Sequence, residues 1–378
     1  MLRRIYGVSL KEIRQLRRDS RTLALLTIFP ALMLVLYGYA LTFDVKHIRL
    51  AVLDYDRSAT SREFVNGFFR SNYFDYAGAL ERLSDADRLL DAGDIRAVIV
   101  VPPDFGASIE QGERVGVQLL VDGANANTAG ITSGYVNLRV REFTIARVSD
   151  RMQALGMPVV TLPIQIEQRV WYNPTLETSK FLVPGLIGFL LMLVGAVSTS
   201  MSVVREIERN TMEQIVVSSV RSGEFVVGKT LPYVAVGFVT ETATIVSAMV
   251  LFGMPFKGSV GWLFVASFAF LLCALGVGLL ISSIAETQQV AFQITVITTL
   301  LPSVLLSDFV FPIASMPKAL QLFTYVLPPR HFIVILRSII LKGSNVEAWL
   351  AELLFLVGFA AIILTVASLR LRARLRRS

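Results

Sequence analysis

The sequence has few of the residues that build disulfide frameworks and metal sites. Its 378 residues include one cysteine, Cys273, and two histidines, His47 and His331. A single thiol excludes a disulfide framework and a multi-cysteine metal site, and two histidines exclude a histidine-rich metal cluster. Charged residues are scarce as well, at 17% of the chain compared with about 25% in soluble domains. These shortages argue against an ordinary soluble protein.

Apolar residues are abundant instead. They make up 54% of the chain and include 24 phenylalanines, whereas soluble domains contain about 45–50% apolar residues. Disorder is excluded too, because long Leu, Val and Ile runs can bury ample surface. The composition therefore indicates a polytopic membrane protein.

Six stretches are long and apolar enough, or nearly so, to cross a bilayer, which takes about 20 residues of helix. The third contains Glu241, and the sixth contains Glu352 near its outer end. We expect the fourth and fifth to form a tight pair, because they are joined near Glu286. The sequence predicts a polytopic α-helical membrane protein with six transmembrane helices, at residues 22–43, 181–204, 231–256, 258–285, 287–307 and 349–369.

Basic residues gather at both ends of the chain. Residues 1–21 carry seven and the tail at residues 370–378 carries five. Because lysine and arginine mark the cytoplasmic side, both termini are predicted to be cytoplasmic in a multi-pass protein of the cytoplasmic (inner) membrane. Residues 318–342 would lie outside, and their alternation of apolar and basic residues favours an interfacial helix. The net charge of +7 then reflects topology and contact with anionic lipids rather than nucleic acid binding.

Residues 44–180, between the first two spans, hold 15 basic and 18 acidic residues, a net charge of −3. Strand and helix patterns alternate in this stretch, which predicts an extracytoplasmic (periplasmic) α/β domain. It shows no carboxylate pair or Ser–His arrangement, so a binding or docking role is favoured over catalysis. The predicted strands are residues 48–53, 97–101 and 115–121, and the predicted helices are residues 61–70, 84–91 (with Ser84 as its cap) and 124–155.

One phosphate-loop motif is rejected. Residues 223–230 read GEFVVGKT and match G-x-x-x-x-G-K-[ST]. Such a loop needs a preceding buried strand inside an α/β domain, but here a segment of about 25 residues between two spans leaves no room for a nucleotide pocket. The same segment, residues 205–230, has apolar residues at helical spacing among charges. Two interpretations remain open: a helix that receives force from a partner, or a connector lying on lipid headgroups.

Several motifs in order resemble the ABC-2 type transporter permeases, in particular their bacterial drug-export subgroup with a large extracellular domain. The resemblance covers essentially the whole chain. It begins with Arg18 and Asp19 before the first span and rests on REIERNTMEQ at residues 205–214, Gly228-Lys229 with Pro232, LPSVLLS at residues 301–307, VVPPDF at residues 100–105 and WYNP at residues 171–174.

This resemblance implies a permease that pairs with a second copy of itself or a homologous permease and binds a separate ABC ATPase subunit, in some cases with a periplasmic membrane-fusion adaptor. The chain itself would hold no cofactor, because ATP and Mg are bound by the partner ATPase. Residues 1–21 become a cytoplasmic amphipathic connector helix. The residues implied to couple to the ATPase are Arg205, Glu206, Glu208, Arg209, Thr211, Glu213 and Gln214.

A further set of polar residues could line a translocation path. Glu241 lies ten residues into the third span, about 15 Å deep by helical rise, where a carboxylate is costly and marks a pathway or a partner. Two interpretations stay open: contact with a cationic substrate or a proton, or a protonated structural residue bonded to nearby threonines. Asp308 and Asn210 stand where the family usually has glycine. The path candidates are Glu241, Gln288, Gln289, Gln293 and Asp308.

Together these observations predict the membrane-spanning permease subunit of an ATP-binding-cassette exporter for a hydrophobic or cationic, drug-like compound. The chain is expected to be a transport subunit rather than an enzyme, since no span presents clustered catalytic side chains. The alternatives are an ABC exporter of a lipid or glycan, or a non-transporting membrane scaffold whose outer domain binds a partner.

Overall fold

The computed structural model describes residues 1–40, 47–71, 73–156, 171–173, 177–209, 211 and 222–375. The chain divides into two compact units. A helical unit contains Met1–Thr42 and Val170–Ser378, and an α/β unit contains Phe43–Arg169. Each unit is described by itself.

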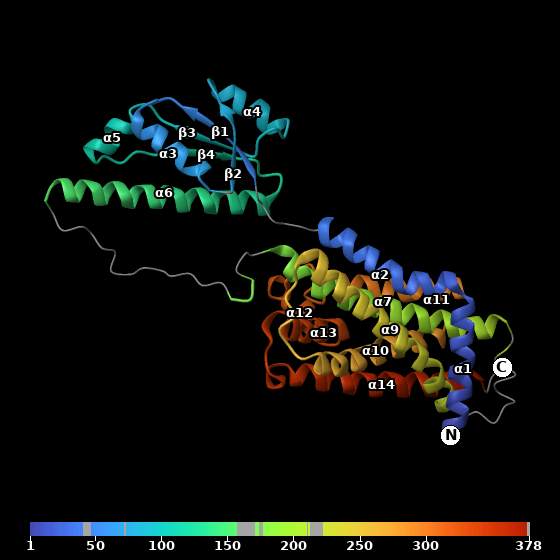
Figure 1. Cartoon of the computed structure of the whole chain (residues 1–378). Helices are drawn as coiled ribbons and strands as arrows, with labels where there is room; N and C mark the ends of the chain where they lie inside the picture. The colour runs from blue at the N-terminus through green and yellow to red at the C-terminus, as the bar shows by residue number, and fades with distance from the viewer. Residues whose placement is uncertain are drawn as a thin grey trace. The chain divides into compact units, whose positions relative to one another are not determined.

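The α/β unit is built on a four-stranded sheet (Figure 1). The strand order is β2-β1-β3-β4, with β1 parallel to both β2 and β3, and β4 antiparallel to β3. The strands are β1 (Ile48–Asp54), β2 (Phe74–Ala79), β3 (Ala97–Val101) and β4 (Gln118–Val121), and the helices are α3 (Ala59–Phe69), α4 (Leu83–Asp91), α5 (Phe105–Gln111) and α6 (Ala126–Ala154).

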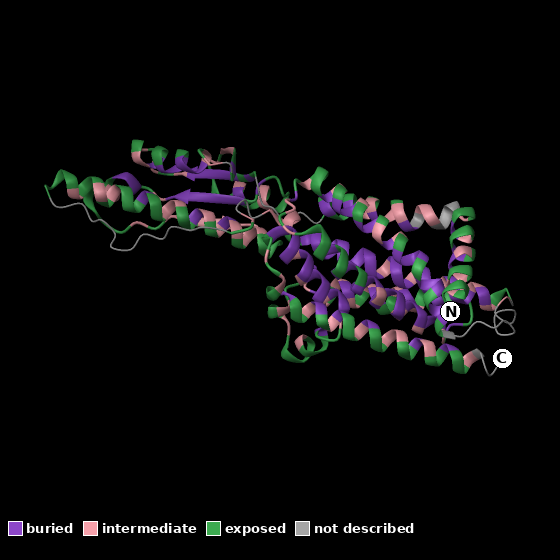
Figure 2. Cartoon of the chain, turned by 60° about the horizontal axis from the view of Figure 1, so that its bottom comes forward, coloured by how far each residue is buried: buried purple, intermediate pink, exposed green. Residues whose placement is uncertain are grey.

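Both faces of the sheet are covered, which explains why β3 is apolar throughout. Ala97, Ile99 and Val101 belong to one core cluster with Phe64 of α3 and Phe143 of α6. The alternate residues of β3, Val98 and Val100, belong to a second cluster with residues of α4. Successive side chains of a strand point to opposite faces, so a strand buried on both faces cannot alternate with polar residues. The predicted buried strand is confirmed, and Figure 2 shows the sheet in buried purple between helices with exposed surfaces.

Several details of this unit differ from the sequence-based expectation, and helix α5 was not predicted. Strand β2 was not predicted, and β4 begins at Gln118 rather than at residue 115. Helix α4 begins at Leu83, and its N-cap is Arg82 without a side-chain cap bond. The prediction that Ser84 caps this helix is therefore wrong: Ser84 already lies inside the first turn.

The helical unit contains five helices long and apolar enough to cross a membrane among the residues searched, or six if a bent pair counts as one span. The five are α7 (Thr178–Glu208), α9 (Ser222–Phe252), α10 (Val260–Ser282), α11 (Gln288–Leu305) and α14 (Leu350–Leu375). Two helices open the unit, α1 (Leu2–Arg18) and α2 (Ser20–Ala40), and Leu26–Ala40 of α2 is apolar. The chain is thus a helical membrane-type protein with a small α/β sheet region near its N-terminus.

Helix α7 is the centre of the bundle. It is buried over most of its length and packs against α10, α11, α9, α2 and α13 (Pro328–Arg337). Helix α10 packs against α7 and α14, and α11 packs against α7, whereas α10 and α11 contact each other little. The expected tight pair is therefore wrong. Helix α10 approaches α7 closely at Gly278, where an added Cβ would come within 2.3 Å of the Ala196 carbonyl oxygen of α7. Only glycine permits this close approach between two helix backbones.

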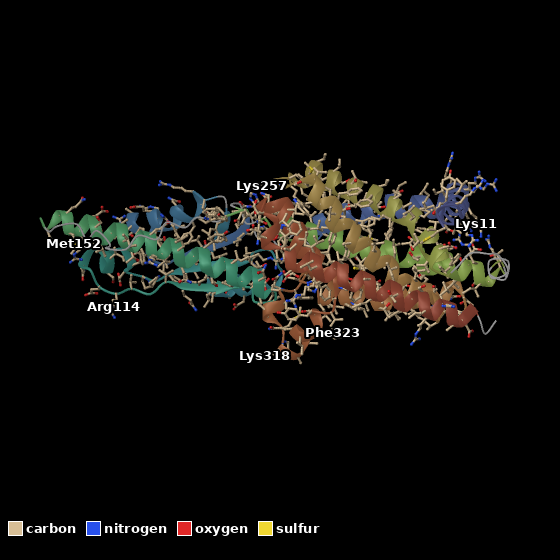
Figure 3. The ribbon with its side chains drawn as sticks, turned by 90° about the horizontal axis from the view of Figure 1, so that it is seen from below. Lys11, Arg114, Met152, Lys257, Lys318 and Phe323 are labelled. Atoms are coloured by element: carbon tan, nitrogen blue, oxygen red, sulfur yellow. The ribbon has the colours of Figure 1, made fainter. Side chains whose placement is uncertain are left out.

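Residues 318–342 do not form a single interfacial helix. Helix α12 (Lys318–Thr324) is followed by α13 and by a π-helical turn, η2 (Ser338–Lys342), and the pair is bent by 80°. Phe332 and Leu336 of α13 are fully buried against the bundle, so this apolar face is covered by protein. Two short 3₁₀ turns complete the unit, η1 (Ile313–Ser315) and η3 (Val346–Ala348). Figure 3 places Lys11 at one end of the helical unit and Lys257 and Lys318 at the other.

Candidate functional site

A buried lysine joins three helices at the α1 end of the helical unit. The Lys229 Nζ of α9 lies 3.1 Å from Glu12 Oε2 of α1 and 3.2 Å from Glu206 Oε1 of α7. The three side chains are 1%, 3% and 4% exposed. A buried charge is tolerated when it is paired and hydrogen-bonded, so Lys229 serves as the counter-ion that holds two carboxylates from different helices together.

Further polar groups saturate the two carboxylates. Lys11 Nζ of α1 lies 2.8 Å and 2.9 Å from the two carboxylate oxygens of Glu206, and the Thr211 hydroxyl donates to the same carboxylate. Glu12 accepts hydrogen bonds from the Ser202 and Tyr233 hydroxyls, at 2.6 Å and 2.8 Å. We call Lys11, Glu12, Glu206 and Lys229 the ion cluster; its two positive and two negative charges balance.

The rejected phosphate-loop motif forms part of this arrangement. Residues 223–230 lie within the continuous helix α9 and not in a loop. Gly228 lets α1 approach closely, since a Cβ there would lie 2.8 Å from Val8 Cβ and 3.0 Å from the Ile5 carbonyl oxygen. The Ser9 hydroxyl donates to the Gly228 carbonyl at 2.8 Å. The glycine and lysine of the motif therefore serve helix packing and an ion pair.

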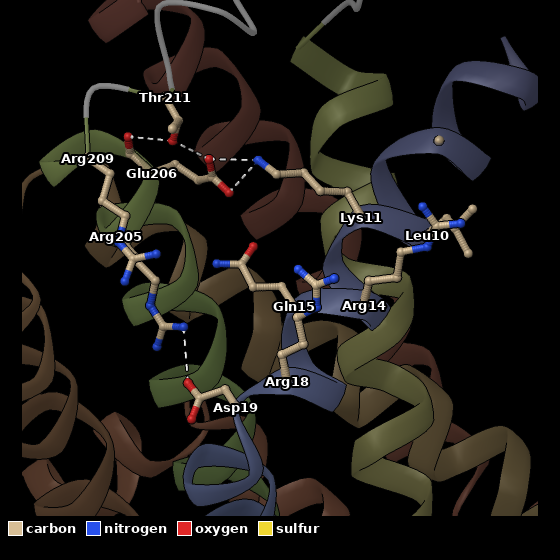
Figure 4. Close-up of a pocket in the computed structure, with 11 residues that line it drawn as sticks. Leu10, Lys11, Arg14, Gln15, Arg18, Asp19, Arg205, Glu206, Arg209 and Thr211 are labelled. Carbon is tan, nitrogen blue, oxygen red and sulfur yellow. Dashed lines mark hydrogen bonds and ion pairs between the residues drawn. The ribbon is translucent and has the colours of Figure 1, made fainter.

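A cavity of about 770 Å³ opens between α1 and the end of α7 beside the ion cluster (Figure 4). Five of its lining side chains are basic and two are acidic, so we call it the basic pocket. It is lined by Gly7, Leu10, Lys11, Arg14, Gln15, Arg18, Asp19, Arg205, Glu206, Arg209 and Thr211.

The predicted coupling residues fall around this pocket as far as they are described. Arg205 and Glu206 lie in the last turn of α7, and Arg209 is its C-cap. The Arg205 guanidinium reaches Asp19 Oδ2 at 3.3 Å. Residues 205–208 continue α7, so the helix expected within residues 205–230 is not a separate one over these four residues. Glu213 and Gln214 lie outside the described residues.

The structure brings one predicted path residue to the coupling residues instead. Gln288, the first residue of α11, accepts a hydrogen bond from Arg205 Nε at 3.2 Å. Its backbone N–H donates to Glu208 Oε1 at 2.7 Å, and its side-chain amide donates to the same carboxylate. Gln289 and Gln293, on the same helix, are exposed. Gln288 therefore lies at the end of α7, whereas Gln289 and Gln293 lie on the exposed surface of α11.

Glu241 lies in the middle of α9 and is 3% exposed. Its carboxylate accepts a hydrogen bond from the Ser267 hydroxyl of α10. The Thr244 hydroxyl donates to the backbone carbonyls of Thr240 and Glu241, at 3.0 Å and 2.8 Å, and not to the carboxylate. The Thr242 hydroxyl donates to the Phe238 carbonyl. The polar partner of the carboxylate therefore comes from the neighbouring helix, which sequence spacing does not reveal.

Asp308 lies at the opposite end of the unit and pairs with Arg337 of α13. The Arg337 guanidinium also donates to the Asp308 and Phe181 carbonyls, at 2.7 Å and 3.2 Å, and stacks over the Phe181 ring. The backbone of Asp308 is left-handed, with φ 65°, a conformation that favours glycine. The ion pair joins α13 to the C-terminal end of α11.

Sequence reasoning missed Glu12, Lys11, Arg337 and the role of Lys229. A usable signal existed for Lys229, because a lysine among apolar residues at the start of a span requires a counter-ion. The partner could not be identified, since Glu12 is more than 200 positions away. Within the described ranges, no group of three His, Cys, Asp or Glu residues could hold a metal ion.

The fold defines a helical membrane-type protein with a small α/β unit, and comparison with known proteins gives the family. Residues 20–369 match the family model described as ABC-2 family transporter protein, so the chain belongs to that family.

Three relatives from Escherichia coli (strain K12) align along almost their whole length. The probable multidrug ABC transporter permease YbhS is 32% identical over 374 residues, which cover 99% of this chain and 98% of the relative. The probable multidrug ABC transporter permease YbhR is 29% identical over 347 residues, 92% of each chain. The inner membrane transport permease YhhJ is 27% identical over 378 residues, 98% of this chain and 97% of the relative. The predicted family is confirmed.

Proposed function

We propose that the chain is the membrane-spanning permease subunit of an ATP-binding-cassette exporter and that a separate ATPase subunit drives it. Family membership and the names of the relatives support transport. The proposed cargo is a hydrophobic or cationic compound, moved outward across the cytoplasmic membrane by a dimer with a second copy or a homologous permease.

The orientation proposed from the basic termini gives the two ends of the helical unit their roles. The α1 end, which carries the basic pocket, would face the cytoplasm. The opposite end would face outward. The α/β unit, proposed to be extracytoplasmic, would meet a partner such as a membrane-fusion adaptor. Counting α2 as the first span gives six spans, and the bent pair α12–α13 then lies on the outer side.

The ion cluster is the observation that carries this proposal. It fastens α1 and α9 to α7 immediately beside the residues proposed to contact the ATPase. Breaking a buried ion pair by removing one partner costs about 3–5 kcal/mol, so the three helices resist separation at this point. Force applied at the end of α7 would therefore move α1, α7 and α9 together and change access to the translocation path. The three joined helices would act as the bistable element that couples the ATPase contact to the path.

Co-purification with the ATPase tests this proposal. The wild-type chain in mild detergent should carry an ABC ATPase, and the charge reversals Glu208→Lys and Glu213→Lys should release it. Glu206 is left unchanged because its carboxylate is buried in the ion cluster. The reversals Lys318→Glu and Glu347→Lys at the opposite end are matched controls and should retain the ATPase. Failure to recover any ATPase from native membranes, with another protein held by the α/β unit, would favour the scaffold alternative.

The proposed role of Glu241 in handling a cationic substrate or a proton has its own test. Transport into inverted vesicles is compared for Glu241→Gln, which keeps the side-chain shape and removes the charge, and for Ser267→Ala, which removes the hydrogen-bond donor. A path role predicts slower transport of cationic substrates with neutral ones unaffected. Equal rates for both substrate classes in Glu241→Gln would assign the carboxylate to helix packing. Transport of a lipid or glycan, with no drug transported, would support the other exporter alternative.

A further inference from the structure

The basic pocket contains more positive charge than its own residues neutralise. Lys11 is paired with Glu206, and Arg205 is paired with Asp19. The three other cations, Arg14, Arg18 and Arg209, have no hydrogen bond or ion pair with any residue of the described chain. Within the described residues, Arg14 and Arg18 thus have no counter-ion, and Arg209 has only the neighbouring charge of Glu208. This excess of positive charge would suit an anion.

The three arginines approach the cavity from two sides. Arg14 and Arg18 are one turn apart on α1, about 6 Å along the axis, and Arg209 caps α7. Figure 4 shows the α1 arginines across the pocket from Arg205 and Arg209. Guanidinium groups bind phosphate oxygens through paired N–H donors. A cavity of about 770 Å³ is large enough for a headgroup of several non-hydrogen atoms.

The depth of the pocket indicates where this phosphate comes from. Arg18 and Asp19 immediately precede the apolar helix α2, whose long apolar run begins at Leu23. Arg205 follows directly on Val204, the last residue of the buried apolar stretch of α7. Both walls therefore lie where the apolar part of a span ends, the level at which a bilayer places its headgroups. Anionic lipids of the cytoplasmic leaflet attract basic side chains at this level.

We propose that the basic pocket binds the phosphate-bearing headgroup of an anionic phospholipid, which bridges α1 to the end of α7. The inference rests on the orientation given under the proposed function, in which the α1 end is cytoplasmic. The bound lipid joins α1 to α7 at the surface of the helical unit, whereas the ion cluster joins the same helices in the interior. The lipid therefore stabilises the packing of α1 against α7 beside the coupling residues. The net charge of the lined pocket, five positive and two negative groups, selects anionic over zwitterionic headgroups.

Binding of a short-chain phosphatidylglycerol to the purified full-length chain in detergent tests this site. Each arginine near an anionic headgroup contributes about fivefold in affinity, so replacing all three with glutamine should weaken binding about 100-fold. The control replaces Arg3, Arg17 and Arg372, which lie outside the pocket, with glutamine and should bind as wild type. A variant with lysine at the three pocket positions should retain most of the affinity, because it keeps the charge. Thermal unfolding of each variant checks that it is folded.

The remaining outcomes separate the proposal from its rivals. Equal weakening in the pocket and control variants would show general surface charge and overturn the site. Binding of inorganic phosphate without the lipid would show a free anion site and overturn the lipid assignment. If the pocket variant loses the ATPase but keeps its lipid affinity, the arginines bind the ATPase rather than a lipid. This result would also overturn the lipid assignment. The lipid measurement needs no ATPase, so failure of the proposed function would be seen separately, in the co-purification.

Discussion

Removing the charge of Lys229 should destabilise the helical unit more than any surface change. In Lys229→Met the carboxylates of Glu12 and Glu206, which are 3% and 4% exposed, lose the cation that lies 3.1–3.2 Å from both. Removing one partner of a buried ion pair costs about 3–5 kcal/mol. Glu206 keeps Lys11, so most of the cost falls on Glu12.

This reasoning predicts a rescue. The second change Glu12→Gln removes the unpaired charge but keeps a side-chain oxygen for the Ser202 and Tyr233 hydroxyls. The double variant should be more stable than the sum of its single changes by about 2 kcal/mol. Denaturant titration in mixed micelles measures the free energy of unfolding of each variant. The exposed Lys318 provides the control. The change Lys318→Met should alter the free energy of unfolding by less than about 0.5 kcal/mol.

Two results would refute the account of the ion cluster. In the first, Lys229→Met lowers the free energy of unfolding no more than Lys318→Met does. This would mean that the carboxylates reach water or become protonated once the Lys229 cation is removed. Alternatively, the costs of Lys229→Met and Glu12→Gln could simply add, which would mean that the two side chains do not interact. Either result would also remove the physical basis for moving α1, α7 and α9 as one body.

Two further predictions concern helix packing. Gly278→Ala places a Cβ 2.3 Å from the Ala196 carbonyl oxygen and should lower the free energy of unfolding by about 1–3 kcal/mol. The control Gly261→Ala lies on the same helix α10, where the nearest neighbouring atom is 3.7 Å away, and should be neutral or stabilising. Equal unfolding temperatures for the two variants would contradict this prediction. Arg337→Gln should lower the free energy of unfolding by about 1–3 kcal/mol, because Asp308 loses its charged partner. Arg337→Lys keeps the charge and should recover part of this loss. An unchanged denaturant midpoint for Arg337→Gln would contradict the pairing.

The α/β unit shows which elements a sequence pattern predicts well. Strands β1 and β3 and the long helix α6 were predicted because buried β-branched runs and an uninterrupted helical stretch are local signals. Strand β2 was missed because it is an edge strand with a mostly exposed sequence, and its pairing with β1 is not visible locally. The wrong cap at Ser84 has a similar cause: several residues can start a helix, and tertiary packing selects one.

The candidate site was predicted in part. The segment that begins at Arg205 was identified from its resemblance to a family motif, and its first residues do line the basic pocket. Gln288 was assigned to the path and lies instead beside Glu208. Sequence spacing does not reveal this contact, because a side chain at the end of one helix can turn to any of the neighbouring helices.

The sequence by itself determined the class of protein and the apolar segments, because the cost of placing charge in a bilayer imposes long uncharged runs that are readable residue by residue. It also determined the family, through motifs kept in order along the chain. Only the tertiary structure decided which charges meet. Lys229, Glu12 and Glu206 come from three helices and form one cluster, since a buried charge must find its counter-ion wherever packing places it, and sequence distance does not limit that choice.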